Sequence, residues 1–361
     1  MTLFTSEQSF WSAYQRKLAF LLRQEENAPD FGLGAFVLVC ANAYFNSEVL
    51  SALEPDLRAS YLRIRKVCAD FLTQGRLFND HYAEDLLVFL KMALVGLDNL
   101  QVTEHRRVGN WNVQFNHLRS VRPQRSAAQP VASIDIPFNE RMFYYDDRIL
   151  ERESFWCGEL NGKNACLLYN KYPFARLHSL LLPEPEKKLR QYLEADMLAW
   201  AWDSVGTLAQ TLPGFGMGYN SIGTFASVNH LHFQSFIEPR GMPVTWDNWA
   251  HNGGTETYPL PCRVFEDWQS AWAWMEEIYR RDQTSFNLLL APGRIYGFER
   301  RRQGTYRHSS WTSGFAWFEL SGNMLTFSKD DYLNFSAELV PAEFEKIRTI
   351  QAQFTRSSSE P

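Results

Sequence analysis

The sequence predicts an α+β fold in which helices pack on an antiparallel sheet, preceded by an N-terminal helical cap. Apolar residues recur at helical spacing through about residues 5–98, and short alternating segments begin near residue 105. The order strand, strand, helix, strand then occupies residues 165–237. At 361 residues the chain is longer than one typical core requires. We therefore expect a cap over residues 1–105, a catalytic unit over residues 106–240 and a C-terminal α+β lobe over residues 241–361.

The predicted cap consists of amphipathic helices. Thr5 and Gln8 have the spacing of a capping box, and apolar residues repeat at helical intervals over residues 61–72 and 82–97. Residues 34–44 are the most apolar segment but are too short to span a bilayer, so we expect them in the core. The N-terminus lacks the apolar run and the small-residue cleavage site of a signal peptide.

The central unit is predicted to contain two strands within residues 165–182 and then a long helix that Pro185 opens. The glycine-rich stretch at residues 214–218 is interpreted as a turn, and residues 227–237 as a strand. The helix carries an apolar stripe, whose members are spaced by three, four or their sums and are expected in the core: Leu189, Leu193, Met197, Trp200, Leu208 and Leu212.

The C-terminal half partly repeats this order, with a Trp-rich helix over about residues 266–280 followed by strands. In both halves an aromatic residue and an asparagine follow the helix, as Tyr219-Asn220 and Phe286-Asn287. Two dipeptides are too few to establish a duplication, so a degenerate second copy is an open alternative.

Charge and cysteine content exclude several classes of protein. A net charge of −5 and a pI near 6.0 do not suggest a nucleic-acid-binding surface. The five cysteines are odd in number and form no CxxC pair, which predicts reduced thiols and no structural zinc. We therefore expect a cytoplasmic protein with no membrane and no nucleic-acid partner.

The most informative segment contains the pattern His-x-His-x-Gln. Side chains alternate between the faces of a strand, so His230, His232 and Gln234 are predicted on one face, with Leu231 and Phe233 turned to the core. Accidental polar residues on a half-exposed strand and a zinc site are the alternatives. No Asp, Glu or Cys on that row supplies a third zinc ligand, and an amide is a poor one. The row favours phosphorus chemistry.

At these residues the sequence resembles the histidine-triad superfamily, in the His-x-His-x-Gln branch of galactose-1-phosphate uridylyltransferase, diadenosine tetraphosphate phosphorylase and the GDP-hexose phosphorylases. The resemblance includes YNKYPFARLHSLLLPE at residues 169–184 and a loop with Asn220, Gly223 and Ser227, and it covers about residues 113–236. It implies a HIT-like antiparallel sheet. The cysteine-based zinc site of the uridylyltransferases has no counterpart in this sequence.

The resemblance also implies roles for the three residues of the row. His232 would be the nucleophile that attacks the α-phosphorus and forms a nucleotidyl-histidine. His230 would support it, with a purely structural role as the alternative. Gln234 replaces the third histidine of the hydrolases, and an amide donates a hydrogen bond but cannot shuttle a proton. Because activation of water gains from a base, Gln favours a phosphorylase or transferase over a hydrolase.

Substrate contacts follow from the same resemblance. Asn220, Gly223 and Ser227 would bind the α-phosphate, partly through backbone amides. Asn170 and Lys171 would contact the ribose or a phosphate.

Further candidates lie on either side of that segment. Arg119 and Arg122 belong to an Arg-x-x-Arg-Pro element similar to one in the uridylyltransferases, and they would offset phosphate charge. His178 matches a position beside the site, with a packing role as the alternative. The run Arg300 to Arg302 could clamp a distal phosphate, although we expect most of it on a solvated face.

The function predicted from these residues is that of a nucleotidyltransferase or phosphorylase that cleaves a nucleoside diphosphate sugar or a dinucleoside polyphosphate through a covalent intermediate. A hydrolase of the same fold and a non-catalytic nucleotide-binding regulator are the alternatives. The partners would be a nucleotide or nucleotide-sugar substrate and phosphate or a sugar phosphate, and a homodimer is an open alternative. No cofactor is required, and a divalent cation is an open alternative.

Overall fold

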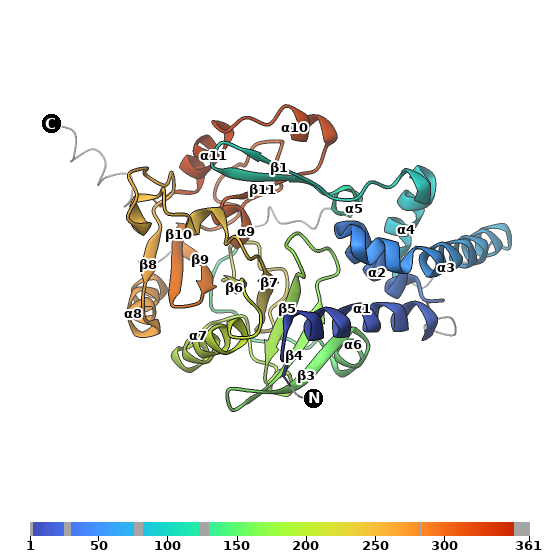
Figure 1. Cartoon of the computed structure of the whole chain (residues 1–361), viewed down its shortest axis with the longest axis horizontal. Coiled ribbons are helices and arrows are strands. Elements are labelled where there is room, and N and C mark those ends of the chain that lie inside the picture. Colours follow the sequence, from blue (N-terminus) through green and yellow to red (C-terminus); the bar gives the residue numbers. More distant parts are fainter. Residues whose placement is uncertain (1–2, 25–29, 76–81, 123–129, 282–283, 350–361) are drawn as a thin grey trace.

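The structure is a computed structural model that describes residues 3–24, 30–75, 82–122, 130–281 and 284–349 (Figure 1). It contains an N-terminal group of helices, an eight-stranded antiparallel sheet and a smaller three-stranded sheet. The predicted α+β class is confirmed.

The N-terminal helices are arranged around one helix that is apolar on all sides. That helix, α2 (Leu33–Phe45), is buried from Leu33 to Tyr44, which confirms the predicted core segment. Reciprocal hydrogen bonds between Ser6 and Ser9 begin the first helix, so the capping box lies one residue beyond the prediction. The other three helices of this group are α1 (Glu7–Gln24), α3 (Ser47–Thr73) and α4 (Ala83–Val95). None of the helices in the described part of the chain combines the length and the apolar composition that a membrane span requires.

The large sheet forms the centre of the molecule, and every pair of neighbouring strands within it is antiparallel. Helices α7 (Ala195–Ala209) and α8 (Trp268–Tyr279) pack against it and against each other (Figure 1). In spatial order its strands are β3 (Ser154–Leu160), β4 (Lys163–Tyr169), β5 (Ser179–Pro183), β7 (Phe233–Ile237), β6 (Phe215–Asn220), β9 (Thr284–Ala291), β10 (Arg294–Arg301) and β8 (Arg263–Phe265).

The same order of elements occurs twice within this sheet. Strand, helix, strand, strand appears as β5, α7, β6, β7 and again as β8, α8, β9, β10. The two sets meet where β6 pairs with β9, and there Asn220 lies opposite Asn287. The topology therefore has the two-fold order that a duplicated unit would produce, although strands from both sides of residue 240 share one continuous sheet.

The small sheet joins segments that are far apart in the sequence. Strand β1 (Glu104–Val108) pairs with β2 (Trp111–Phe115), and β2 pairs in parallel with β11 (Asn323–Thr326). The apolar cluster beside it also includes residues of the C-terminal helix. The shorter helices are η3 (Leu97–Asn99), α5 (His117–Ser120), α6 (Asp147–Glu153), η4 (Pro185–Lys187), η5 (Pro243–Thr245), η6 (Ala250–Asn252), α9 (Trp317–Leu320), α10 (Lys329–Leu333) and α11 (Leu339–Ile347).

The long helix predicted from Pro185 begins ten residues later, at Ala195. Glu184 and Lys188 both adopt the left-handed conformation, which is costly for residues with a Cβ and interrupts a right-handed helix. The predicted stripe is nevertheless on the core side, because five of its members are buried and Leu189 is partly buried against them.

The glycine-rich stretch forms strand β6, so its interpretation as a turn is wrong. A Cβ at Gly218 would overlap the indole of Trp317, and one at Gly216 would overlap the ring of Phe236. Glycine is required here because two aromatic rings approach the strand backbone closely.

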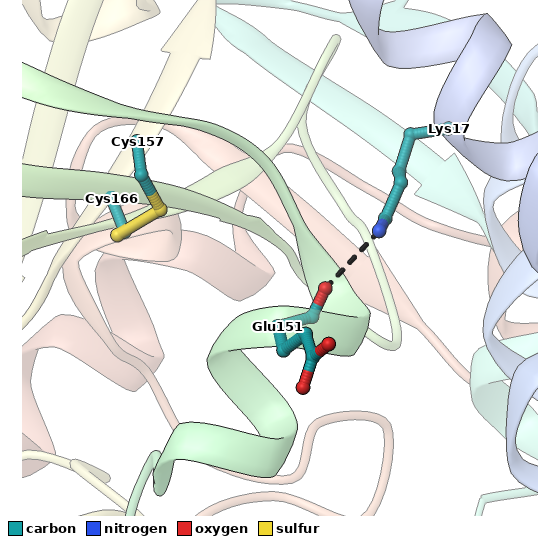
Figure 2. Close-up of a disulfide and its surroundings, with 4 residues drawn as sticks. All are labelled: Lys17, Glu151, Cys157 and Cys166. Carbon is teal, nitrogen blue, oxygen red and sulfur yellow. Dashed lines mark hydrogen bonds between the residues drawn. A yellow bond between two sulfur atoms is a disulfide. The ribbon is translucent and has the colours of Figure 1, made fainter. Parts of the chain in front are cut away.

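Cys157 of β3 and Cys166 of β4 are register partners and form a disulfide (Figure 2). The prediction of reduced thiols is wrong for this pair, which the sequence spacing alone did not reveal. Cys40 and Cys68 are buried free thiols. Figure 2 also shows a contact between α1 and α6, the helix that precedes β3: Lys17 Nζ donates a hydrogen bond of 3.1 Å to the backbone oxygen of Glu151.

Candidate active site

A cleft of about 1720 Å³ opens between the N-terminal helices, one end of the large sheet and the C-terminal segment. Helices α1 and α4, the loop after β4 and residues 308–319 all contribute to its walls. Most of the predicted site residues line it: Arg119, Arg122, Asn170, Lys171, Asn220, Ser227, His232 and Gln234. His178, Gly223 and His230 are not part of the lining.

His232 is held in one orientation at the wall of the cleft. Its Nδ1 lies 2.7 Å from the backbone oxygen of His230, and because a carbonyl only accepts, Nδ1 carries the hydrogen and donates it. Nε2 is therefore the atom with the free lone pair in the neutral ring. Burial lowers the pKa of His232 below its usual value, opposed by the hydrogen bond to His230, so the imidazole is neutral at pH 7. This is the state that a nucleophile needs.

His230 is not part of the cleft lining, whereas His232 and Gln234 are, so the three residues of the predicted row do not all reach the cleft. Strand β7 begins only at Phe233, and the chain bends at residues 229–230. His230 is fully buried, with its ring 5.5 Å from that of Phe138 and 5.8 Å from that of Tyr145. Burial lowers the pKa of His230 to about 4. The neighbouring histidine therefore contributes its backbone oxygen, and its ring packs among aromatic side chains.

Gln234 comes two residues after His232, in strand β7. The orientation of its side-chain amide is fixed by Trp317. The indole Nε1 donates a hydrogen bond of 2.8 Å to Oε1 of Gln234. An indole nitrogen is only a donor, so the oxygen of the amide must face Trp317 and the NH₂ group must point elsewhere. Because Gln234 lines the cleft, that NH₂ group is available to an oxygen of a bound ligand.

The predicted phosphate loop is only partly brought to the cleft. Asn220 is buried at the cleft wall, where its Oδ1 accepts hydrogen bonds from the Trp317 backbone (3.0 Å) and from Asn287 Nδ2 (2.6 Å). Nδ2 of Asn220 therefore points away from the Trp317 backbone N–H and from Asn287 Nδ2. Ser227 is exposed at the lining, whereas Gly223 packs on Ser285 outside it, with φ of 89°.

Asn170, Lys171 and His178 form a connected group beside this row. Asn170 Nδ2 lies 3.2 Å from His178 Nε2, and Lys171 Nζ donates a hydrogen bond of 2.5 Å to Asp85 on α4. Burial, together with the smaller effect of the charge of Arg119, lowers the pKa of His178 to about 3. His178 is therefore a neutral, fully buried ring behind the lining.

Arg119 brings positive charge to the cleft, together with a carboxyl group that the sequence did not single out. Arg119 Nη1 donates to the backbone oxygen of Tyr172 (2.8 Å), while its buried Nε has no hydrogen-bond partner in the part of the chain that the structure describes. Burial lowers the pKa of Arg119 to about 9, which leaves it charged at neutral pH. Glu319 also lines the cleft, and burial raises the pKa of its carboxyl to about 7. Arg122 lies with its guanidinium 5.4 Å from the Tyr172 ring, and residue 123 of this element lies outside the described residues.

The arginine run at residues 300–302 is not on a solvated face. Arg300 is fully buried and donates hydrogen bonds to the Phe315 oxygen and to the Tyr306 hydroxyl. Arg302 is also buried and donates to the Ala132 oxygen (2.7 Å). Arg302 and Ala132 are 170 positions apart in sequence, so residue spacing gave no indication of this contact.

Gln191 is a positioning residue that sequence reasoning missed. Its Oε1 accepts a hydrogen bond from the backbone N–H of His232 (2.9 Å), and its Nε2 donates to the backbone oxygens of Asn220 (3.0 Å) and His232 (3.2 Å). One buried amide thus joins the two chain segments that carry the candidate nucleophile and the candidate phosphate donor. The only signal was a glutamine between Leu189 and Leu193, two members of the predicted apolar stripe. Among the described residues, no group of three or more His, Cys, Asp or Glu side chains is arranged to hold a metal ion.

The segment of the chain that contains His232 and Gln234 is similar to known proteins. Residues 109–236 match the family model described as GDPGP1-like, N-terminal domain. The central segment resembles the GDP-hexose phosphorylases. This confirms the resemblance predicted from the His-x-His-x-Gln pattern.

Individual relatives support the match. GDP-D-glucose phosphorylase 1 of Bos taurus is 31% identical over 138 residues, which are 36% of this chain and 35% of that protein. The Xenopus laevis protein of the same name is 42% identical over 82 residues, or 22% of this chain and 20% of that protein. GDP-L-galactose phosphorylase 1 of Arabidopsis thaliana is 34% identical over 92 residues, or 25% and 20%. The matched part thus spans about a third or less of these relatives.

Among solved structures, yeast Ap4A phosphorylase Apa2 is similar to this chain with a TM-score of 0.48 and 16% identity. The similarity covers 73% of this chain and 93% of the yeast protein.

Proposed function

We propose that this protein is a nucleotidyltransferase that splits a nucleoside diphosphate hexose with inorganic phosphate through a nucleotidyl intermediate on His232. The orientation of His232 is the observation that carries the proposal. Its Nδ1 hydrogen is committed to a backbone oxygen, its ring is neutral, and its side chain lines a cleft large enough for a nucleotide sugar.

In the first half of the proposed reaction, Nε2 of His232 attacks the α-phosphorus of the substrate. The bond between the α-phosphorus and the bridging oxygen breaks, and hexose 1-phosphate leaves with that oxygen and its electron pair. The Nδ1–H of His232 keeps its hydrogen bond to the His230 oxygen, which stabilises the positive charge that develops on the ring.

In the second half, an oxygen of inorganic phosphate attacks the same phosphorus, and the N–P bond breaks. The products are the nucleoside diphosphate and free His232. The NH₂ group of Gln234 would donate to a non-bridging oxygen in both steps, and Arg119 would balance the phosphate charge. Gln234 cannot accept a proton from water, which favours phosphate over water as the acceptor.

The matched relatives are named as phosphorylases of GDP-D-glucose and GDP-L-galactose, which favours a guanosine diphosphate hexose as the substrate of this chain. The matched segment contains His232 and Gln234, so the proposed chemistry belongs to the part that the relatives share. The activity of the whole chain is therefore a proposal built on that segment.

The route requires no cofactor, because attack of an imidazole on phosphorus needs only hydrogen-bond donors and positive charge around the phosphate. A divalent cation bound to the substrate is tested by comparing turnover with and without EDTA. A cytoplasmic location and a homodimer are also proposals, to be tested by cell fractionation and by size-exclusion chromatography.

The proposal is tested by intact-protein mass spectrometry. The wild-type protein is incubated with GDP-glucose without phosphate, and a mass increase of one guanylyl group is expected. Addition of phosphate should remove that group and release GDP. His232→Asn should show no increase while its circular dichroism spectrum and unfolding midpoint stay close to wild type. Guanylylation of the His232→Asn protein would contradict the proposal. So would the absence of a mass increase in the wild-type protein with every nucleoside diphosphate hexose tested.

A further inference from the structure

The ion pair between Asp85 and Lys171 has the donor and acceptor groups that the edge of a guanine base requires. Lys171 Nζ and Asp85 Oδ1 are 2.5 Å apart, so a donor lies directly beside an acceptor. Both side chains line the cleft and are partly buried, with 30% of the Lys171 side chain and 17% of the Asp85 side chain exposed. Guanine presents the acceptor O6 beside the donors N1–H and N2–H₂. The two patterns are complementary.

The place of this pair along the cleft agrees with the order of groups in a nucleotide. Gln234, which would contact the α-phosphate, lies beside His178, and His178 contacts Asn170. Lys171 is the next residue and contacts Asp85 in the first turn of α4. Phosphate, ribose and base of one bound nucleotide would meet these residues in the same order.

The N-terminal helices hold this end of the cleft in position. Asn42 of α2 donates a hydrogen bond of 3.1 Å to the backbone oxygen of Asn170, and Tyr169 donates one of 2.5 Å to the backbone oxygen of Tyr14 on α1. Asp85 Oδ2 lies beside Gly34 of α2, where an added Cβ would be only 3.1 Å from it. The carboxylate therefore belongs to a packed helical layer, and its position is fixed relative to Lys171.

We propose that Asp85 and Lys171 form the guanine-recognition site, in which Asp85 accepts from N1–H and N2–H₂ and Lys171 donates to O6. A carboxylate has enough lone pairs to keep its bond to Lys171 while it accepts two more hydrogen bonds. Adenine offers only one donor group on this edge and has no O6, so it leaves the carboxylate incompletely paired. This deepens the proposed function, on which it rests, and it assigns Lys171 to the base and not to ribose or phosphate.

The test measures binding of GMP, IMP and AMP by isothermal titration calorimetry, which needs no turnover. IMP differs from GMP only by the absence of the N2 amino group. Wild type should prefer GMP to IMP and AMP. Asp85→Asn should weaken GMP by about 10- to 100-fold and remove the preference for GMP over IMP. Lys171→Met should weaken GMP and IMP alike and leave AMP little changed, because O6 is common to the first two.

Asp56→Asn is the matched control, since Asp56 lies on α3, is ion-paired with Arg23 (3.0 Å) and is not part of the cleft lining. It should bind all three nucleotides as wild type does. A merely structural role of Asp85 would weaken all three nucleotides equally, and that result would overturn the proposal. Equal or undetectable binding of GMP, IMP and AMP by wild type would overturn it as well. Failure of the proposed function is distinguishable, because it appears as absent guanylylation of His232 while the base preference stays measurable.

Discussion

The indole nitrogen of Trp317 donates a hydrogen bond of 2.8 Å to Oε1 of Gln234, and this contact decides which end of the glutamine amide faces the cleft. The indole is itself fixed, because it stacks on Phe236 with ring centres 5.3 Å apart and fills the space that Gly218 leaves beside β6. A residue 83 positions away in sequence thus presents the NH₂ group of Gln234 to a ligand.

Trp317→Phe should retain most of the ring contact and lose the N–H donor. Gln234 is then free to turn its oxygen to the cleft, so we expect guanylylation of His232 to slow by about 10-fold with little change in GMP affinity. Single-turnover kinetics with GDP-glucose measures the first quantity and calorimetry the second. Equal loss of affinity and rate would indicate general damage to the site.

Gln234→Ala removes the proposed donor altogether and should slow formation of the guanylyl-histidine by about 100-fold. Gln234→His places a titratable group at the same position, and it should raise the ratio of hydrolysis to phosphorolysis, even if total activity falls. The products of hydrolysis and of phosphorolysis are separated by chromatography. An unchanged ratio in the His variant, or a wild-type enzyme that prefers water, would favour the hydrolase alternative.

The pH dependence of the first half-reaction follows from the burial of His232. Its pKa in the folded protein is lowered, so the neutral nucleophile persists as the pH falls through the usual value of 6.5. The guanylylation rate, measured in single turnovers without phosphate, should therefore decline only below pH 6.5. A decline centred at or above 6.5 would show that the imidazole is not desolvated as the structure indicates.

Arg119→Met combined with Arg122→Met should weaken GDP binding by at least about 10-fold, because two positive charges leave the phosphate end of the cleft. Binding of guanosine should change much less, since it has no phosphate. Arg240→Met is the matched control, because Arg240 lies exposed in the turn after β7 and outside the cleft lining. Equal weakening of GDP and guanosine would remove the assignment to phosphate.

Glu319→Gln should stabilise the protein at alkaline pH. The carboxyl has a pKa of about 7 when folded against an ordinary 4.5, so the unfolded state loses its proton first as the pH rises between these values. The free energy of unfolding is therefore reduced, by about 3 kcal/mol at pH 8, and the amide removes that cost. The amide oxygen of the variant can still accept the hydrogen bond from the Ala316 backbone, which is 2.8 Å long.

Urea denaturation at pH 5 and pH 8 checks this prediction, with Glu159→Gln on the exposed side of β3 as the control. The Glu319→Gln protein should gain stability over wild type mainly at pH 8. A gain of the same size at both pH values would show that ionisation of Glu319 is not its cause.

Secondary structure was predictable where local signals agreed with packing. The apolar segment at residues 34–44 became the central helix α2, and the alternation after residue 230 correctly turned Leu231 and Phe233 to the core. The predicted start of the long helix was wrong, because residues 184 and 188 adopt the left-handed conformation, which their local propensity does not predict. The disulfide between Cys157 and Cys166 depends on strand register, which spacing does not reveal.

The sequence by itself was enough to predict the class of chemistry that we propose, because His232 and Gln234 are two residues apart and their relation needs only an extended chain. It also determined the resemblance of the central segment to the GDP-hexose phosphorylases. Only the tertiary structure decided which groups complete the site. Gln191, Asp85 and the short helix α9, which carries Trp317 and Glu319, are three separate segments of the chain. Their places at the candidate site depend on long-range packing that no local spacing records. His230 shows the converse, since simple alternation placed it beside His232, whereas in the structure its ring packs among three aromatic rings and is not part of the cleft lining.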